Sequence, residues 1–351
     1  MLDNNSISSK LYNYLYIKEP RVPSIYFLPK IHKDILPPPV RPILSANDCP
    51  TERISAFVDF FLKPLVKKIP SYIKDTADLI NKIEALPPLP ENTLLVTMDV
   101  QSLYTNIPTD EGLRSSARAL LHNRDHHDKP STTELISLLR LVLTCNNFEF
   151  NGEHFLQING TAMGTKVAPS FANIFMAESE ETHLLKHTLL PLVWWRFIDD
   201  IFCIWTYSET DLQEFMTYLN SCHPTIKFTC EYSQTQVNFL DTTIKFVSEH
   251  RAYTTLYVKP TDTHTYLHYR SAHPRHSKSG GPYSQLLRVK RICSKVVDYE
   301  ENAQKILHYY ILRGYPTDRL EESKNKVDSH ERATLLAPKQ NESTSDQENF
   351  F

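Results

Sequence analysis

The sequence is poor in glycine, with 7 glycines against 23 prolines among 351 residues, which excludes collagen-like and glycine-rich low-complexity classes. Its six cysteines form no CxxC pair and no dense framework, so we expect a reducing compartment and no zinc ribbon. The N-terminus, MLDNNSISSK, lacks the basic start and apolar core of a signal peptide. No apolar run is long enough to span a membrane. We therefore expect a nuclear or cytoplasmic protein with no membrane partner.

Aromatic and apolar residues are plentiful instead, and hydrophobic residues make up 41% of the chain, enough for a sizeable core. The formal net charge is −3, but residues 251–295 hold many Lys and Arg against Asp262 alone, interleaved with tyrosines. Cations bind a phosphate backbone and aromatic rings stack on bases or sugars. A solvated surface would also be charged but usually mixes both signs, so the pattern favours nucleic-acid contact. The candidate contacts are Lys259, Arg270, Arg275, Arg288, Lys290 and Arg291.

Two adjacent carboxylates, Asp199 and Asp200, interrupt an otherwise apolar run from Trp194 to Trp205. Burying two like charges would be costly unless a cation neutralised them. Hard oxygen ligands of this kind select Mg²⁺ or Mn²⁺. The alternative is an Asp-Asp turn in a solvated hairpin.

A third carboxylate, Asp99, follows the apolar run from Leu94 to Met98, which has the character of a buried strand. Two strands that each end in a carboxylate, side by side in one sheet, make a cage for two divalent ions. Such ions, roughly 4 Å apart, activate an attacking hydroxyl and stabilise a leaving oxygen in one displacement. Nucleotidyl transfer needs this arrangement. It also needs cations for a triphosphate, which Lys30, Lys33 and Arg41 would supply.

The remaining elements form a mixture of helices and strands. Prolines make residues 21–45 an extended arm of loops and edge strands. Residues 51–67 have helical periodicity, interrupted near Pro64. Further along we expect a helix opening at Pro108, a helix at 131–145, a hairpin at 148–156, a helix at 168–187, a strand-turn-strand at 193–205, a helix at 208–222 and strands at 226–232 and 237–246. This order predicts an α+β fold without regular βαβ repetition.

A series of motifs follows in a fixed order along the chain. It consists of YFLPKIHK (26–33), RPILS (41–45), PTERIS (50–55), MDVQSLYTNIP (98–108), QINGTAMGTKVAPSFANIFM (157–176), RFIDDIF (196–202), VNFLDTTI (237–244) and the stretch 264–294. The chain resembles a reverse transcriptase, and most closely those of Penelope-like retroelements, which are similar to the catalytic subunit of telomerase. The resemblance extends from about residue 20 to residue 315.

The resemblance implies a role for each matching position. Asp99 and Asp199 look like the metal-binding aspartates of the palm, with Asp200 as the accompanying carboxylate. Lys30 and Arg41 look like finger residues that hold the triphosphate; the alternative for both is an ordinary solvated charge.

Further roles concern the incoming nucleotide and the primer. Tyr104 falls where these enzymes place the ring that packs under the sugar and would clash with a ribose 2′-OH. Without the resemblance, Tyr104 is a core aromatic. Met163 and Gly164 resemble the segment that lies against the nascent base pair, where glycine permits close backbone approach. The segment 239–241 resembles the hairpin that grips the primer, although Asp241 equally fits a turn.

The basic segment 259–295 would begin the thumb, which holds a primer–template duplex mainly through its backbone. Its histidines occur without paired cysteines, which favours phosphate contacts or packing over zinc. Phe197 stands where many reverse transcriptases carry Tyr, and Gly280–Gly281 stand where an apolar residue is expected. Penelope-like proteins usually carry a longer N-terminal region and often a GIY-YIG endonuclease. Neither is in this sequence, so we expect a truncated copy without that nuclease.

The sequence therefore predicts a right-hand polymerase fold of the α+β class. Its expected activity is that of an RNA-directed DNA polymerase with two Mg²⁺ ions, or Mn²⁺, acting on an RNA template, a DNA primer and deoxynucleoside triphosphates. The expected parts are an N-terminal arm and fingers (1–93), a palm with a fingers insertion (94–246), a thumb-like basic helical region (247–320) and a disordered tail (321–351).

Two alternatives remain open. One is a retroelement remnant that binds RNA or an RNA–DNA duplex without synthesis. The other is a DDE-type transposase or nuclease with an RNase H-like sheet. That fold gives no reason for the set formed by Lys30, Arg41, Tyr104 and Met163–Gly164.

Overall fold

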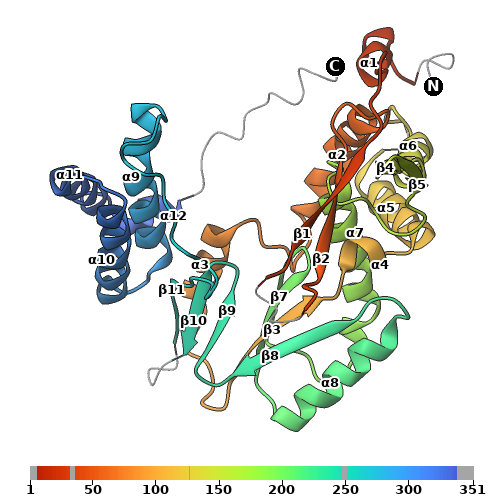
Figure 1. The fold of residues 1–351 in the computed structure, drawn as a ribbon. Coiled ribbons are helices and arrows are strands. Elements are labelled where there is room, and N and C mark those ends of the chain that lie inside the picture. The colour runs from red at the N-terminus through yellow and green to blue at the C-terminus, as the bar shows by residue number, and fades with distance from the viewer. Residues whose placement is uncertain (1–5, 32–35, 126, 247–250, 338–351) are drawn as a thin grey trace.

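The computed structural model describes residues 6–31, 36–125, 127–246 and 251–337. Its helices and strands are mixed, and the strands form three separate sheets, which confirms the α+β class (Figure 1). Two of the sheets and a group of helices near the C-terminus determine where the predicted site residues lie.

The central sheet contains β6 (Val193–Phe197), β7 (Asp200–Trp205), β3 (Leu94–Val100) and β8 (Phe228–Ser233), in that order and antiparallel throughout. Alternate residues of β3 and β7 pack into two different cores on opposite faces of the sheet. One core includes residues of α5 (Thr109–Asn123), α7 (Ala168–Thr182) and α8 (Glu209–Cys222). Burial on both faces explains why these strands read as continuous apolar runs.

The outer sheet has the order β2 (Val40–Ser45), β1 (Ser24–Pro29), β4 (Asn147–Phe150) and β5 (Glu153–Leu156). It confirms the extended arm and the hairpin, and most of its residues are exposed. It lies beside a group of helices, namely α1 (Ser9–Leu15), α2 (Glu52–Val66) and α6 (Thr132–Thr144) (Figure 1).

Helix α2 corrects one expectation, because it runs unbroken to Val66 through Pro64. A proline removes one backbone hydrogen bond, and here it does so in the last turn, where the loss is small. Leu62 and Leu65 on either side of it are buried and hold the turn in place. The Ser131 capping box of α6 is confirmed, since both of its reciprocal hydrogen bonds form.

A small sheet has the order β11 (Ala252–Leu256), β10 (Thr242–Phe246) and β9 (Gln236–Phe239). The expected single strand at 237–246 is therefore wrong. Leu240 adopts φ 54°, which turns the chain back, so that β9 and β10 pair as a hairpin. Helix α3 (Thr76–Glu84) packs against β11 of this sheet, whereas the short helix α4 (Leu103–Asn106) packs against α7.

The helical lobe consists of α9 (Arg275–Ile292), α10 (Val296–Leu312), α11 (Thr317–Asp328) and α12 (Arg332–Leu336). The expected disorder is therefore wrong for residues 321–336. Leu320, Val327 and Leu336 are all buried, so a few apolar side chains at the right spacing suffice when neighbouring helices supply the rest of the core. Residues 338–351 lie outside the described part of the chain.

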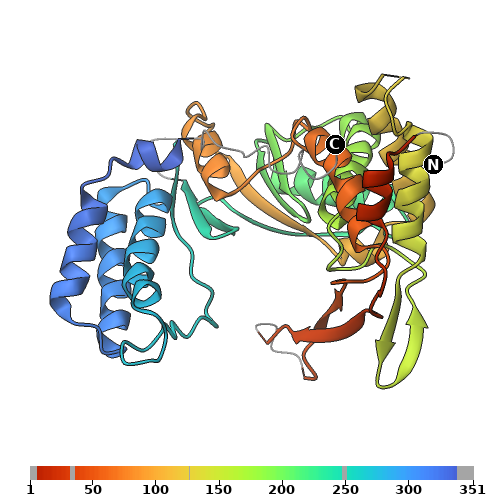
Figure 2. The ribbon, with the colours of Figure 1, turned by 90° about the horizontal axis from the view of Figure 1, so that it is seen from above.

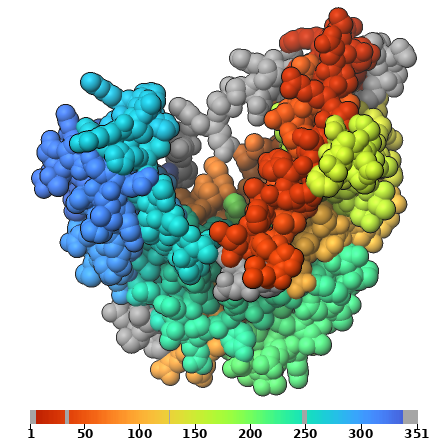
Figure 3. Space-filling model, in the orientation of Figure 1, coloured from red at the N-terminus to blue at the C-terminus, as the bar shows by residue number. Residues whose placement is uncertain are grey.

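The helical lobe and the outer sheet stand apart, with the central sheet between them at the base (Figure 2). The space-filling view shows the molecule hollowed between the two (Figure 3). Within the described residues, no helix is both long enough and apolar enough to cross a membrane.

Candidate active site

Strand pairing in the central sheet brings the three predicted carboxylates together. The β3–β7 register places Asp99 directly opposite Asp200. Strands β6 and β7 close on the pair Phe197–Asp200, so Ile198 and Asp199 form the tip of a tight hairpin, the 197–200 turn. Asp199 is fastened to β3 as well, because the Val100 N–H donates to its carbonyl oxygen at 3.0 Å. The prediction that two neighbouring strands of one sheet bring the carboxylates together is confirmed.

The 197–200 turn contains a strained residue. Ile198 adopts φ 59°, the left-handed region that a β-branched side chain avoids. Such a conformation costs on the order of 1–2 kcal/mol and persists only where the surroundings hold it. Strain of this kind is concentrated at functional sites, which is consistent with a turn that aims adjacent carboxylates.

The electrostatics show that the carboxylates act on one another. Burial, followed by the charges of Asp199 and Asp99, raises the pKa of Asp200 to about 6. Burial also raises the pKa of Asp199, against the opposing effect of Arg41 and Lys30. The cations of the N-terminal arm therefore lie close enough to Asp199 and Asp200 to affect the pKa of these carboxylates.

Such a group of hard oxygen donors fits a divalent cation, because a cation relieves the repulsion that raises the pKa of Asp200. Asp99 is exposed and the other two carboxylates are half-buried, so all three remain accessible. No set of three or more His, Cys, Asp or Glu side chains in the described ranges is already arranged in the geometry of a metal site. The donor chemistry and the mutual repulsion, and not a formed coordination sphere, identify the candidates.

Tyr104 lies on α4, close to the carboxylates. Burial and then the charge of Asp199 raise its pKa to about 12, while Arg41 opposes the rise. Its backbone carbonyl accepts a hydrogen bond from the Thr161 N–H at 2.7 Å, which joins α4 to the segment before α7. The ring is partly buried against the main core. This position is compatible with both predictions for Tyr104, a core aromatic residue and a ring that packs under the sugar.

Gly164 permits a close approach of two backbones, with β2 as the partner. Its φ is 134°, and a Cβ there would lie 2.0 Å from the Leu44 carbonyl oxygen. The Leu44 N–H donates to the Met163 carbonyl at 2.8 Å, so the segment with Met163 and Gly164 packs directly against the strand that carries Arg41. The close approach of Leu44 therefore explains by itself why this position requires glycine.

Lys30 and Arg41 lie at one end of the β1–β2 pair. Arg41 pairs opposite Leu28, and the Lys30 N–H donates to the Pro39 carbonyl at 2.8 Å. Arg41 is exposed and Lys30 is half-buried. The third predicted cation, Lys33, lies outside the described residues.

The six predicted cations near the C-terminus divide into two groups. Arg288, Arg291 and Lys290 are half-buried, and Lys290 donates to the carbonyls of Val327 and Asp328 at the end of α11. The exposed cations are Lys259, Arg270 and Arg275.

Arg288 has a protein partner, Asp241. Its Nε donates to an Asp241 carboxylate oxygen at 3.1 Å, and the Thr76 hydroxyl donates to the other oxygen at 2.6 Å. Asp241 is therefore a turn residue that joins the β9–β10 hairpin to α3 and to the helical lobe. Among the histidines of this segment, His264 stacks on Tyr309 with ring centroids 4.0 Å apart.

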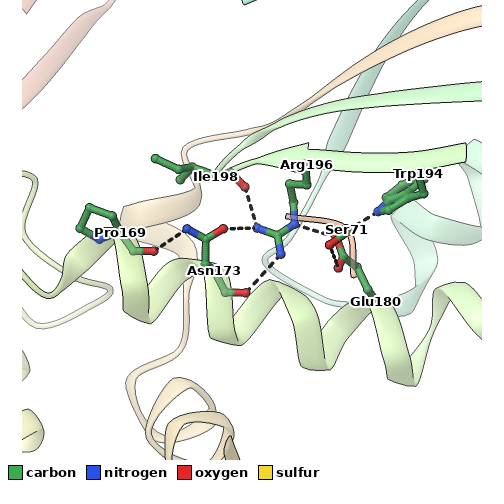
Figure 4. Close-up of polar contacts among 7 residues, drawn as sticks. All are labelled: Ser71, Pro169, Asn173, Glu180, Trp194, Arg196 and Ile198. Atoms are coloured by element: carbon green, nitrogen blue, oxygen red, sulfur yellow. Dashed lines mark hydrogen bonds and ion pairs between the residues drawn. The ribbon is translucent and has the colours of Figure 1, made fainter. Parts of the chain in front are cut away.

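Arg196 was not assigned a role from the sequence, although it lies within the RFIDDIF motif. The side chain is 0% exposed and is held by Glu180, Asn173 and the carbonyl of Ile198 (Figure 4). The available signal was a lone arginine in an apolar strand, because a buried guanidinium always needs partners. The identity of those partners could not be read from the chain.

Solved structures with a similar fold include two kinds of polymerase. Telomerase from Candida albicans, in a complex with a fragment of telomeric RNA, has a TM-score of 0.60 at 10% identity and covers 92% of this chain and 57% of its own. Apo telomerase from Candida tropicalis has a TM-score of 0.52 at 11% identity, with coverages of 89% and 60%. The RNA-dependent RNA polymerase of a human picobirnavirus has a TM-score of 0.55 at 9% identity, with coverages of 86% and 59%.

These likenesses show a right-hand polymerase fold. The chain spans little more than half the length of the telomerase chains. No curated protein matches the sequence.

Two family descriptions match the sequence itself. The animal helix-turn-helix domain matches residues 265–325, which contain α9, α10 and most of α11 and were not predicted as a unit. The second match covers residues 34–250, more than half of the chain, and includes all three carboxylates. Its description is reverse transcriptase (RNA-dependent DNA polymerase), and the chain therefore belongs to the reverse transcriptase family.

Proposed function

We propose that this chain is an RNA-directed DNA polymerase that extends a DNA primer on an RNA template. The primer 3′-OH attacks the α-phosphate of a deoxynucleoside triphosphate, and pyrophosphate leaves. The observation that carries the proposal is that Asp99, Asp199 and Asp200 lie together at the ends of paired strands β3 and β7, within the residues matched to the reverse transcriptase family.

The carboxylates have the clearest part in this chemistry. Asp99 and Asp199 would hold two divalent ions, Mg²⁺ or Mn²⁺, with Asp200 as a weaker third ligand. Bound there, the ions supply activation of the primer hydroxyl and stabilisation of the leaving oxygen. Val100 keeps Asp199 against β3, so that the two ligand-bearing strands stay in register.

The cations of the arm act on the nucleotide. Arg41 and Lys30 would bind the triphosphate, supported by their electrostatic effect on Asp199. Tyr104 would pack under the deoxyribose and exclude a 2′-OH, and Met163–Gly164 would border the nascent base pair. The resemblance of the motifs supports these two roles.

Contacts to the duplex are assigned to the exposed cations near the C-terminus. Lys259, Arg270 and Arg275 would bind phosphates, since each is exposed and carries positive charge. Arg288, Lys290 and Arg291 would contribute less, because they are half-buried.

A finer assignment concerns the type of retroelement whose polymerase the chain resembles. The motif series, above all the segment 264–294, supports a Penelope-like retroelement polymerase. The division into arm and fingers, palm, and thumb-like region at residues 93 and 246 is part of the same proposal. All six cysteines, each in the described part of the chain, are free, which supports a nuclear or cytoplasmic location.

Primer extension on an RNA template tests the proposal. Wild type, Asp99→Ala and Asp199→Ala are compared in Mg²⁺ and in Mn²⁺ with one labelled primer. We expect incorporation by wild type alone. Equal incorporation by all three proteins contradicts the assignment of the carboxylates. Salt-dependent duplex binding with no incorporation by any of them would instead support the alternative of a protein that only binds nucleic acid.

A further inference from the structure

Arg196 is the centre of a polar cluster beside the 197–200 turn. Its Nε donates to Glu180 Oε1 at 2.7 Å, and its Nη1 donates to Asn173 Oδ1 at 2.7 Å (Figure 4). Its Nη2 donates to the Asn173 carbonyl at 3.2 Å. Both acceptor residues belong to α7, so one guanidinium joins strand β6 to that helix.

The same guanidinium reaches the turn itself. Nη1 also donates to the Ile198 carbonyl at 3.2 Å. Ile198 is the strained residue, and Asp199 next to it is held by Val100 from the opposite side. The two backbone carbonyls at the tip of the hairpin are therefore both held, one through the Arg196 side chain to α7 and one directly to β3.

Glu180 is built into the cluster as firmly as Arg196. Its Oε1 also accepts from Trp194 Nε1 at 3.0 Å, and its Oε2 accepts from the Ser71 hydroxyl at 2.6 Å. The Arg196 backbone is fixed too, because its N–H donates to the Ser71 carbonyl at 2.6 Å. Since Glu180 neutralises the guanidinium, Arg196 adds little net positive charge at the carboxylates, and its effect is geometric.

We propose that Arg196 is a positioning residue that ties the backbone of the 197–200 turn to α7 and so fixes the direction of Asp199 and Asp200. The inference rests on the proposed polymerase function, which it deepens. It also connects two parts of the candidate site, because Asn173 Nδ2 donates to the Pro169 carbonyl in the first turn of α7. That helix begins directly after the segment that contains Met163 and Gly164.

Three variants of the full chain separate positioning from simple stability. Arg196→Lys keeps a cation for Glu180 but loses the planar fork that reaches Asn173 and Ile198 together. Arg196→Met combined with Glu180→Gln removes both charges and leaves an acceptor for Trp194. Glu180→Gln alone is the matched control, because it breaks the buried ion pair and leaves the bond from Arg196 to Ile198 in place.

Two readouts are taken on each variant. One is single-nucleotide primer extension, which gives kcat and the KM for the nucleotide. The other is amide hydrogen exchange of the peptide covering residues 193–205, measured in EDTA, which reports the turn without any need for activity. Thermal unfolding of each protein accompanies both.

For Arg196→Lys and the double variant we expect kcat to fall about 10- to 100-fold, with the KM within about threefold of wild type. Exchange at the turn should become faster in both. Glu180→Gln should lower the unfolding temperature, but it should change turn exchange and kcat less than Arg196→Lys does, because the bond from Arg196 to Ile198 remains.

Wild-type kcat, or wild-type exchange at the turn, in Arg196→Lys overturns the inference, whether or not the double variant folds. An equal loss of kcat in Glu180→Gln overturns it as well, since general destabilisation then accounts for the effect. If wild type incorporates no nucleotide, the proposed function fails by itself. The exchange measurement still decides whether Arg196 holds the turn.

Discussion

The central sheet and the outer sheet each have four strands, yet they carry their site residues in opposite ways. Strands β3 and β7 are buried on both faces, and their ends fix Asp99 and Asp200 opposite each other. Strand β1 is exposed at all but one position, whereas β2 is exposed at Val40 and Arg41 and mostly half-buried beyond them. The predicted site residues of the central sheet have short side chains on buried strands, whereas Arg41 of the outer sheet has a long side chain on a more exposed strand.

This difference follows from what each chemical task requires. Carboxylates that share two ions must keep a fixed separation, so they belong on strands that the core immobilises. Cations that clamp a triphosphate act over a longer range and tolerate adjustment. Substitutions in the central sheet should therefore remove turnover, while those in the outer sheet should mainly weaken nucleotide binding.

The strongest test concerns the carboxylates themselves. Asp99→Asn and Asp199→Asn each remove a charge that the two proposed ions would require, and we expect incorporation to fall about 10³-fold or more. Single-nucleotide extension measures it. Asp110→Asn, at an exposed carboxylate on α5, is the matched control and should leave the rate unchanged. A comparable loss in the control would contradict the proposed role of Asp99 and Asp199.

The contact between Gly164 and β2 tests how the outer sheet is joined to the rest of the site. Gly164→Ala places a Cβ against the Leu44 carbonyl at φ 134°, and we expect a loss of about 3 kcal/mol in the free energy of unfolding. Urea denaturation measures this loss. Gly152→Ala is the control, since its φ is 80° but nothing lies within 4 Å, so it should lose only about 1 kcal/mol. Equal losses would mean that backbone strain alone acts at both positions.

Arg41 tests the outer sheet directly. Arg41→Ala should raise the KM for the nucleotide about tenfold and change kcat little, because one charge-assisted contact to the triphosphate is lost. Steady-state kinetics at varied nucleotide concentration separate the two parameters. Arg21→Ala provides the comparison, since Arg21 is exposed and pairs with Asp48 at 3.8 Å. A fall in kcat with an unchanged KM would place Arg41 with the carboxylates in function.

Asp200 gives the smallest effect and a pH dependence. Its folded-state pKa of about 6 lies above the ordinary value of 3.8, so ionisation opposes folding. Wild-type stability should fall as pH rises from about 4 to about 6, and Asp200→Asn should lack this fall. In EDTA at pH 8 the variant should be about 1 kcal/mol more stable than wild type, with the difference vanishing near pH 4. A variant less stable at pH 8 would contradict the electrostatic description of the turn.

Local patterns predicted much of the fold because they act over short stretches of chain. The Ser131 capping box, the hairpin at 148–156 and the strand that carries Asp99 all depend on neighbours within a few residues. The errors lie where distant packing decides. Helix α2 passes through Pro64, and residues 321–336 form the rest of α11 and all of α12 because Leu320, Val327 and Leu336 fit against other helices.

The candidate site divides in the same way. The apolar runs led to Asp99, Asp199 and Asp200, because carboxylates in apolar strands are unusual within any single segment. Arg196 required the fold, since its acceptors on α7 precede it by 16 and 23 positions. The partner of Arg288, Asp241, lies 47 positions away, and nothing in either segment indicates the other.

By itself the sequence determined which residues are candidates for the chemistry, because charge, hydrogen-bonding capacity and local periodicity belong to each segment. It determined the family for the same reason. The tertiary structure decided which strand faces which, where the Ile198 strain is held, and that Gly164 closes on Leu44. These features depend on contacts between segments far apart in the chain, and only the packed core makes such contacts specific.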